Sequence, residues 1–174
     1  MEEEKGEIDR IHCTIKTQRF NPACSLPVGA KSMSSPKAEC DFLMNAVLPF
    51  AEKMLLKNGG FFPYGGALDP NGEAVAVEPP SNDVILLLKQ AFLQGAKSGV
   101  YKATALVYDV RVTLPSSEQK SDAIAVSLDH REDYPVIVFF PYEIKEGRLQ
   151  FGEAFAQKGK TDIFKNPRRV HDAD

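Results

Sequence analysis

Four side chains that could do chemistry lie in the most strongly patterned part of the chain: Asp109, Arg111, Asp129 and His130. An arginine flanked by carboxylates can clamp a carboxylate or phosphate group. A histidine beside an aspartate can act as a general base, with Asp129 or Asp122 orienting its ring. The same residues also suit a cross-strand salt-bridge cluster on a sheet, and the sequence leaves both interpretations open.

The segments that carry these residues alternate apolar and polar positions, as β-strands do. We expect strands over residues 101–114, 122–130 and 135–144, with a fourth strand over 148–155. The connections between them are short, which favours antiparallel neighbours. The candidate residues would therefore be carried by a meander.

Alternation divides the first two of these strands into a bulky face and a small-residue face. We expect the bulky faces to pair as the core-facing surface. The small-residue face would hold Ala103, Ala105, Ala123 and Ala125, together with Asp109, Arg111 and Asp129. Alanines permit close approach, so we expect this face to be partly covered by the C-terminal segment, the N-terminal tail or a second copy of the chain.

Two amphipathic helices are expected before the meander. In residues 36–58 apolar side chains recur every three or four positions, Ser35 is a suitable N-cap, and Pro49 would kink or split the helix. A second helix is expected to begin after a cap at Ser81 or Asn82 and to end at Ser98-Gly99.

A hairpin is expected between the helices, in the stretch FFPYGGALDPNGEAVAVE. Asp69-Pro70-Asn71-Gly72 is a strong turn signal, flanked by strands over 61–68 and 73–77. Pro63 and the Gly65-Gly66 pair predict that the first of these strands is irregular or lies at a sheet edge. A phosphate-binding loop is disfavoured, because these glycines do not lead into a helix N-terminus.

The expected fold class is α+β, with two helices packed on one face of a largely antiparallel sheet. The order helix, hairpin, helix and three- or four-strand meander resembles profilin-like and roadblock-like arrangements, an analogy of topology alone. We expect a mobile N-terminal tail over 1–36, one domain over 37–158 and a C-terminal extension over 159–174.

Composition restricts the function classes. The 174-residue chain has a net charge of −3, which argues against a nucleic-acid partner, and its longest apolar run is too short to cross a membrane. The acidic N-terminus MEEEKGEIDR lacks a secretory signal, so a cytoplasmic location is expected. The three cysteines, Cys13, Cys24 and Cys40, have no metal-site spacing, and we expect reduced thiols, no metal and no cofactor.

Four stretches together carry a resemblance to known proteins: FFPYGGALDPNGE, YKATALVYDVRV, SDAIAVSLDHRE and VIVFFPY. Over residues 38–156 the chain resembles a family of small uncharacterised bacterial proteins. The resemblance implies a bacterial cytoplasmic domain, and it assigns no activity and no site residues.

Two functional hypotheses follow. The first is a non-enzymatic module that acts by protein–protein contact, as a homodimer or in a regulatory or immunity role. It is motivated by the small-residue face and by the FFPY sequence repeated at 61–64 and 139–142. The second is a small-ligand-binding protein or hydrolase, which requires the four candidate side chains to converge on one pocket.

Overall fold

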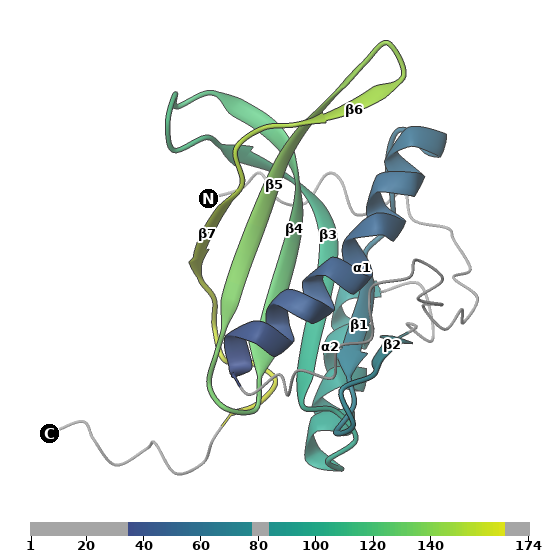
Figure 1. The fold of residues 1–174 in the computed structure, drawn as a ribbon, viewed down its shortest axis with the longest axis vertical. Helices are drawn as coiled ribbons and strands as arrows, with labels where there is room; N and C mark the ends of the chain where they lie inside the picture. The colour runs from purple at the N-terminus through teal and green to yellow at the C-terminus, as the bar shows by residue number, and fades with distance from the viewer. Residues whose placement is uncertain (1–34, 78–83, 166–174) are drawn as a thin grey trace, which may run out of the picture.

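The computed structural model describes residues 35–77 and 84–165, which form two helices and one seven-stranded sheet (Figure 1). The elements are α1 (Pro36–Asn58), β1 (Tyr64–Leu68), β2 (Ala74–Val77), α2 (Val84–Lys97), β3 (Ala103–Thr113), β4 (Lys120–His130), β5 (Val136–Lys145), β6 (Arg148–Phe151) and β7 (Phe155–Lys158). The sheet order is β2-β1-β3-β4-β5-β6, β7 also pairs with β5, and the strand pairs are antiparallel. The α+β class and the expected order of elements are confirmed.

Some predicted features lie outside the described residues. They are Cys13, Cys24, nearly all of the N-terminal tail, the cap of the second helix at Ser81 or Asn82, and the last nine residues of the C-terminal extension. Within the described part of the chain, no helix is both long enough and apolar enough to span a bilayer.

Helix α1 is one continuous helix in spite of Pro49. The Ser35 side chain caps it by accepting a hydrogen bond from the Ala38 amide at 3.2 Å, and Gly59 ends it in the left-handed conformation. Beside Pro49, the Tyr64 hydroxyl donates to the Val47 carbonyl and accepts from the Ala51 amide. In a regular helix the Ala51 amide would donate to the Val47 carbonyl. The tyrosine hydroxyl therefore provides hydrogen-bond partners for both groups in the turn that the proline disturbs.

The two helices lie on opposite faces of the sheet, so the expectation that both pack on one face is wrong. Helix α1 crosses the near face in Figure 1, where Leu43 and Val47 join a core with Val126 of β4. Helix α2 lies behind the sheet, where Leu88 and Phe92 pack on Ala67 and Leu106. Apolar side chains are therefore buried on both faces of β1 and β3, and the strands lack a clean polar side.

Strand β1 is an inner, fully buried strand, whereas the glycines predicted an irregular or edge strand. A Cβ at Gly65 would stand 2.6 Å from the Phe92 ring of α2, and one at Gly66 would stand 2.5 Å from Cγ1 of Val47 in α1. Each glycine makes room for one helix, so the Gly-Gly pair marks close packing on both faces.

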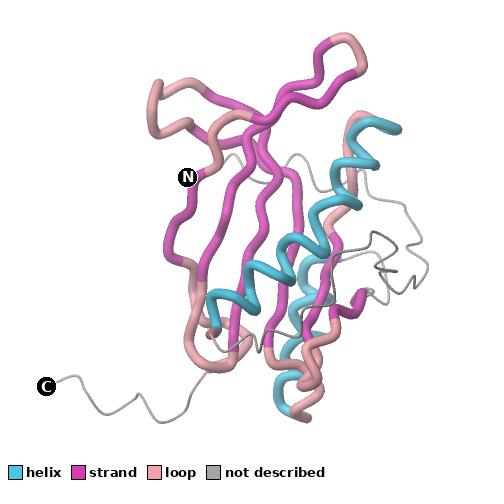
Figure 2. The backbone as a smooth tube through the Cα atoms, in the orientation of Figure 1, coloured by secondary structure: helices cyan, strands magenta, loops and turns pink. Residues whose placement is uncertain are grey.

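The outer edge of β5 is shared by two short strands in place of the single strand expected over 148–155. β6 pairs with Tyr142–Lys145, and β7 pairs with Val136–Phe139. Between them the Gly152 amide donates to the Pro141 carbonyl at 2.8 Å. Pro141 has no amide hydrogen to return on this side, which interrupts the ladder there. The β5–β6 hairpin projects from one end of the sheet (Figure 2).

The close approach at Gly66 generates a stability prediction. We expect Gly66→Ala to lower the free energy of unfolding by about 1–3 kcal/mol, because the added methyl group overpacks the contact with Val47. Urea denaturation measures the change. Gly60→Ala is the matched control, since a Cβ there meets nothing within 4 Å.

The double variant Gly66→Ala/Val47→Ala should lose less stability than the sum of its two single variants, because the smaller side chain relieves the clash. Equal stability of Gly66→Ala and Gly60→Ala would contradict the packing argument.

Candidate functional site

The register between β3 and β4 separates the predicted candidate residues. Asp109 stands opposite Ile124, whereas Asp129 stands opposite Thr104. Directly paired residues of antiparallel strands point to the same face. Asp109 and Arg111 follow Val107 on the α1 face, and Asp129 lies on the α2 face. The expected shared face of Asp109, Arg111 and Asp129 is therefore wrong.

The four candidates also lie at two ends of the sheet. His130 pairs with Ala103, six residues before Asp109, which is about 20 Å along the strand. Asp109 and Arg111 are exposed, and the Tyr142 hydroxyl donates to the Asp109 carboxylate at 3.0 Å. Burial raises the pKa of Tyr142, and the Asp109 charge raises it further. Asp109, Arg111, Asp129 and His130 do not converge on one pocket.

The alanines are divided in the same way. Ala103 and Ala105 lie on the α1 face and belong to its core, so they allow α1 to approach the sheet closely. Ala123 and Ala125 lie on the α2 face, in a separate cluster with Phe139. A single small-residue surface is absent from the described strands, because Ala105 pairs with Leu128 and places small residues beside large ones.

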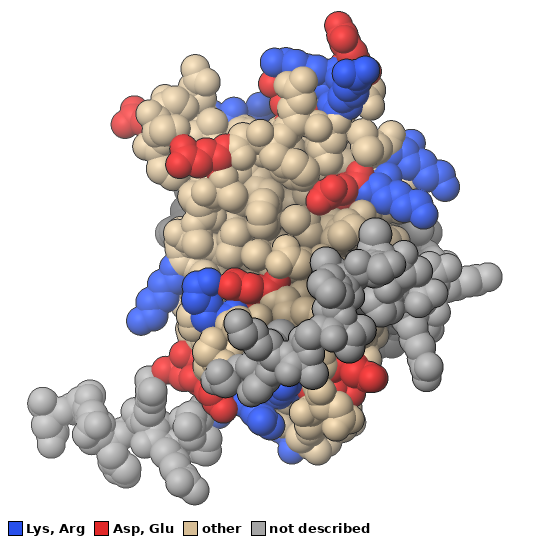
Figure 3. Space-filling view, viewed as in Figure 1, with Lys and Arg blue, Asp and Glu red and all other residues tan. Residues whose placement is uncertain are grey.

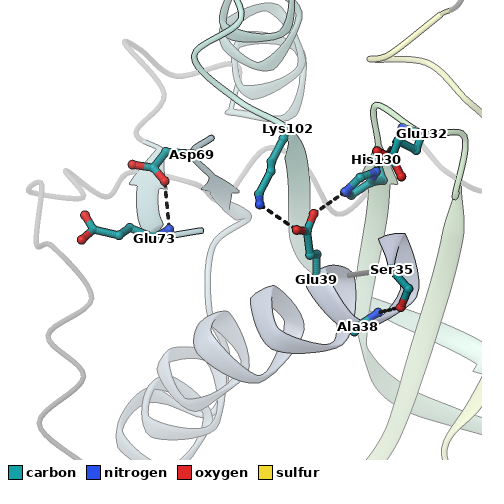
Figure 4. Close-up of polar contacts among 8 residues, drawn as sticks. All are labelled: Ser35, Ala38, Glu39, Asp69, Glu73, Lys102, His130 and Glu132. Carbon is teal, nitrogen blue, oxygen red and sulfur yellow. Dashed lines mark hydrogen bonds and ion pairs between the residues drawn. The ribbon is translucent and has the colours of Figure 1, made fainter. Parts of the chain in front are cut away.

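His130 belongs to a buried polar network on the α1 face (Figure 4). Glu39 of α1 accepts hydrogen bonds from Lys102 Nζ and His130 Nε2, each at 2.7 Å. His130 Nδ1 accepts from the Glu132 amide at 3.0 Å. A ring with one donor and one acceptor nitrogen is the neutral Nε2–H tautomer. Both nitrogens are engaged and the ring is 2% exposed, so this histidine is held as a structural group.

The network joins the first turn of α1 to the start of β3 and the end of β4. Burial alone would raise the pKa of Glu39, but hydrogen bonds from Lys102 and His130, together with the charge of Lys102, outweigh burial, and the pKa is lowered. Sequence reasoning missed Glu39 and Lys102, because the contacts join residues 91 and 63 positions apart. No short-range spacing signals such a contact.

A groove on the α2 face is the best candidate site. It has a volume of about 540 Å³ and runs between α2 and the segment that follows β7. The floor of the groove consists of strand residues: Thr104, Leu106, Tyr108, Ser127, Asp129 and Ile137. One wall belongs to α2 and consists of Ile85, Lys89 and Phe92. The other wall consists of residues 157–160, 162 and 163. We call this feature the α2-side groove. Sites for small molecules have this mixture of apolar lining and a few polar groups.

Asp129 is the unusual residue of the groove. Its Oδ2 accepts from the amides of Ile163 and Phe164 at 2.9 and 3.4 Å, whereas its buried Oδ1 has no partner. Burial raises the pKa of Asp129; the backbone amides of Ile163, Phe164 and His130 oppose the rise, and the nearby charge of Asp162 adds to it. An unsatisfied buried oxygen costs about 1–3 kcal/mol. Of the four predicted candidates, only Asp129 lines this groove.

A second hollow, of about 510 Å³, lies at the opposite end of the sheet between the β3–β4 loop and the β6–β7 connection. Its lining includes Tyr142, Glu143 and Phe151. No buried side-chain atom there lacks a partner among the described residues, so it makes the weaker candidate.

Comparison of the chain with protein-family models, with curated proteins and with solved structures finds no match. Within residues 35–77 and 84–165, no three His, Cys, Asp or Glu side chains are grouped closely enough to hold a metal ion.

The Glu39 network generates a pH-dependent prediction. Glu39→Gln should lower the free energy of unfolding at pH 7 by about 1–3 kcal/mol, because it leaves the buried Lys102 ammonium without its counter-charge. The folded-state pKa of Glu39 is lowered, so its contribution is complete above the usual value of 4.5 and disappears as the pH falls through the folded pKa.

Urea denaturation at pH 7 and at pH 3 tests this sign. The difference between the wild type and Glu39→Gln should shrink at the acidic pH. Asp41→Asn in the same helix is the control, because Asp41 pairs only with the exposed Lys37 among the described residues. A difference in the free energy of unfolding that is larger at pH 3 than at pH 7 would contradict the lowered pKa of Glu39.

Proposed function

We propose that this protein is a non-enzymatic binding module and that the α2-side groove is its binding site. The observation that carries the proposal is the Asp129 carboxyl, which lines the groove and has one buried oxygen without a partner. Buried polar groups are almost always hydrogen-bonded. A ligand that supplies a donor would complete the coordination of this oxygen, as polar groups in apolar pockets commonly do.

The positions of the reactive side chains support binding over catalysis. The four candidates for a hydrolase are spread over both faces and both ends of the sheet. Burial raises the pKa of the Cys40 thiol to about 12, which keeps it protonated at neutral pH. A buried thiol of this kind is a poor nucleophile. His130 has both nitrogens engaged and does not activate a neighbouring group.

The charge distribution supports a partner other than nucleic acid. On the face drawn in Figure 3, acidic and basic side chains are interspersed. The whole chain carries a net charge of −3. Nucleic-acid-binding surfaces instead gather lysine and arginine on one face.

A variant that fills the groove tests the proposal. Ser127 is half-buried in the groove floor, between Leu106 and Ile137 of the neighbouring strands. In Ser127→Phe, the ring should occupy the groove and abolish binding. Ligand-observed NMR with a fragment library of neutral, cationic and anionic compounds measures binding, and amide shifts of the protein locate it.

Ser121→Phe is the matched control, because Ser121 lies on the same strand and face but outside the α2-side groove. We expect fragments that shift groove amides in the wild type and in Ser121→Phe and not in Ser127→Phe. A library without any compound that binds in the groove would refute the proposed function.

A second candidate function is contact with a second copy of the chain through an apolar strip next to the groove. The strip is the partly exposed layer that covers the buried Ala123, Ala125 and Phe139, and it consists of Tyr108, Val110, Val112, Ile137 and Phe155. The strip and the residues that it covers come from β3, β4, β5 and β7. A self-complementary apolar surface suits an isologous dimer.

Sedimentation at micromolar concentration tests this second function. The wild type and Thr113→Lys should sediment as dimers and Val112→Lys as a monomer, because Val112 points to the strip and Thr113 to the opposite face. A monomeric wild type would contradict the dimer.

A further inference from the structure

One wall of the α2-side groove presents a cation above an apolar surface. Ile85, Lys89 and Phe92 are four and three residues apart, so they form one stripe of α2 that faces the groove. Lys89 is half-buried within this stripe. Leu106 and Tyr108 continue the apolar surface across the floor. An apolar body placed here would lie beside Phe92 with the Lys89 ammonium within reach of an attached anion.

The floor and the wall opposite α2 each carry one carboxyl group, Asp129 in the floor and Asp162 in the wall. Asp129 and Asp162 lie close enough for the charge of Asp162 to affect Asp129, and Lys158 and Lys160 also line the groove. Asp129 is 5% exposed, and its Oδ1 is the one buried side-chain oxygen without a partner in the described part of the chain. Like charges close together favour a cation that binds between them.

We propose that the α2-side groove binds a free α-amino acid with a large apolar side chain. The ligand ammonium would donate to Asp129 Oδ1 beside Asp162, and the ligand carboxylate would pair with Lys89. The apolar side chain would lie against Phe92 and Leu106. This inference rests on the proposed function and gives the groove a specific ligand class.

The zwitterion matches the charges of the groove better than a singly charged ligand. A monocation would leave Lys89 without an anion, and a monoanion would leave Asp129 Oδ1 without a donor. Oδ1 is buried, and the amides of Ile163 and Phe164 bond Oδ2 of the same carboxyl, so an ammonium that reaches Oδ1 lies close to these two residues. Binding should therefore shift the Ile163 and Phe164 amide resonances.

Three matched probes test the ligand class by NMR titration of the full chain. L-phenylalanine carries both charged groups, 2-phenylethylamine lacks the carboxylate, and 3-phenylpropionate lacks the ammonium. We expect saturable shifts of groove amides with L-phenylalanine and at least about tenfold weaker binding of each singly charged probe.

Two variants test which residue contacts the ligand carboxylate and which contacts the ligand ammonium. Lys89→Gln should weaken binding of L-phenylalanine about tenfold and leave 2-phenylethylamine unchanged. Asp129→Asn should weaken binding of L-phenylalanine and leave 3-phenylpropionate unchanged, and the single amide oxygen of the asparagine can still accept from the amides of residues 163 and 164. Lys97→Gln, in the same helix but outside the groove, is the control. If Asp129→Asn fails to fold, the measurements on Lys89→Gln still test whether the ligand carboxylate pairs with Lys89.

Each other outcome overturns the inference. Equal binding of 2-phenylethylamine or of 3-phenylpropionate would show a site for one charge only. No binding of L-phenylalanine up to about 10 mM would exclude the ligand class. In both cases fragments that bind the groove and are lost in Ser127→Phe would keep the proposed function, so the two failures are distinguishable.

Discussion

The structure depends on the close packing of two helices against the two faces of one inner strand. Gly65 faces Phe92 of α2, and Gly66 faces Val47 of α1, so β1 lies between the helices without side chains at two successive positions. The next residue toward the N-terminus, Tyr64, reaches into α1 and satisfies the turn beside Pro49. Because α1 and α2 occupy different faces, the strands bury apolar residues on both. This arrangement decides where an open surface can remain: beside α2, over the part of the sheet that α2 does not reach.

Local sequence signals predicted the elements and not their relative placement. The Ser35 cap, the Gly59 end of α1 and the Asp69–Gly72 turn act over a few residues, and each is present in the structure. The division of each strand into two faces was also correct, since it follows from the twofold period of a strand. The pairing of one strand with the next is set at longer range. A bulky-on-bulky register was expected, whereas the alanine side of β3 pairs with the bulky side of β4, because the two helices bury both faces.

This register explains why the four predicted residues do not converge. Asp129 and His130 are neighbours in sequence and point to opposite faces. His130 meets Glu39 and Lys102, which come from distant parts of the chain and could not be associated with it from sequence spacing. The groove likewise combines α2, the sheet floor and the segment after β7. A site formed by three separate segments leaves no motif in any one of them. An aspartate at a strand end occurs in many structural roles, so its presence alone does not indicate a site.

The two adjacent residues also show how polar groups are divided between folding and binding. Both nitrogens of His130 and both oxygens of Glu39 have partners within the chain, so this network is complete and orients α1 on the sheet. Asp129 differs from Glu39 in one carboxylate oxygen. Its Oδ2 holds the segment after β7, while its Oδ1 remains without a partner at the floor of a groove. A complete network adds rigidity and has no capacity left for a ligand, whereas an incomplete carboxyl retains free energy that a donor can recover on binding. The proposed function therefore places binding on the α2 face.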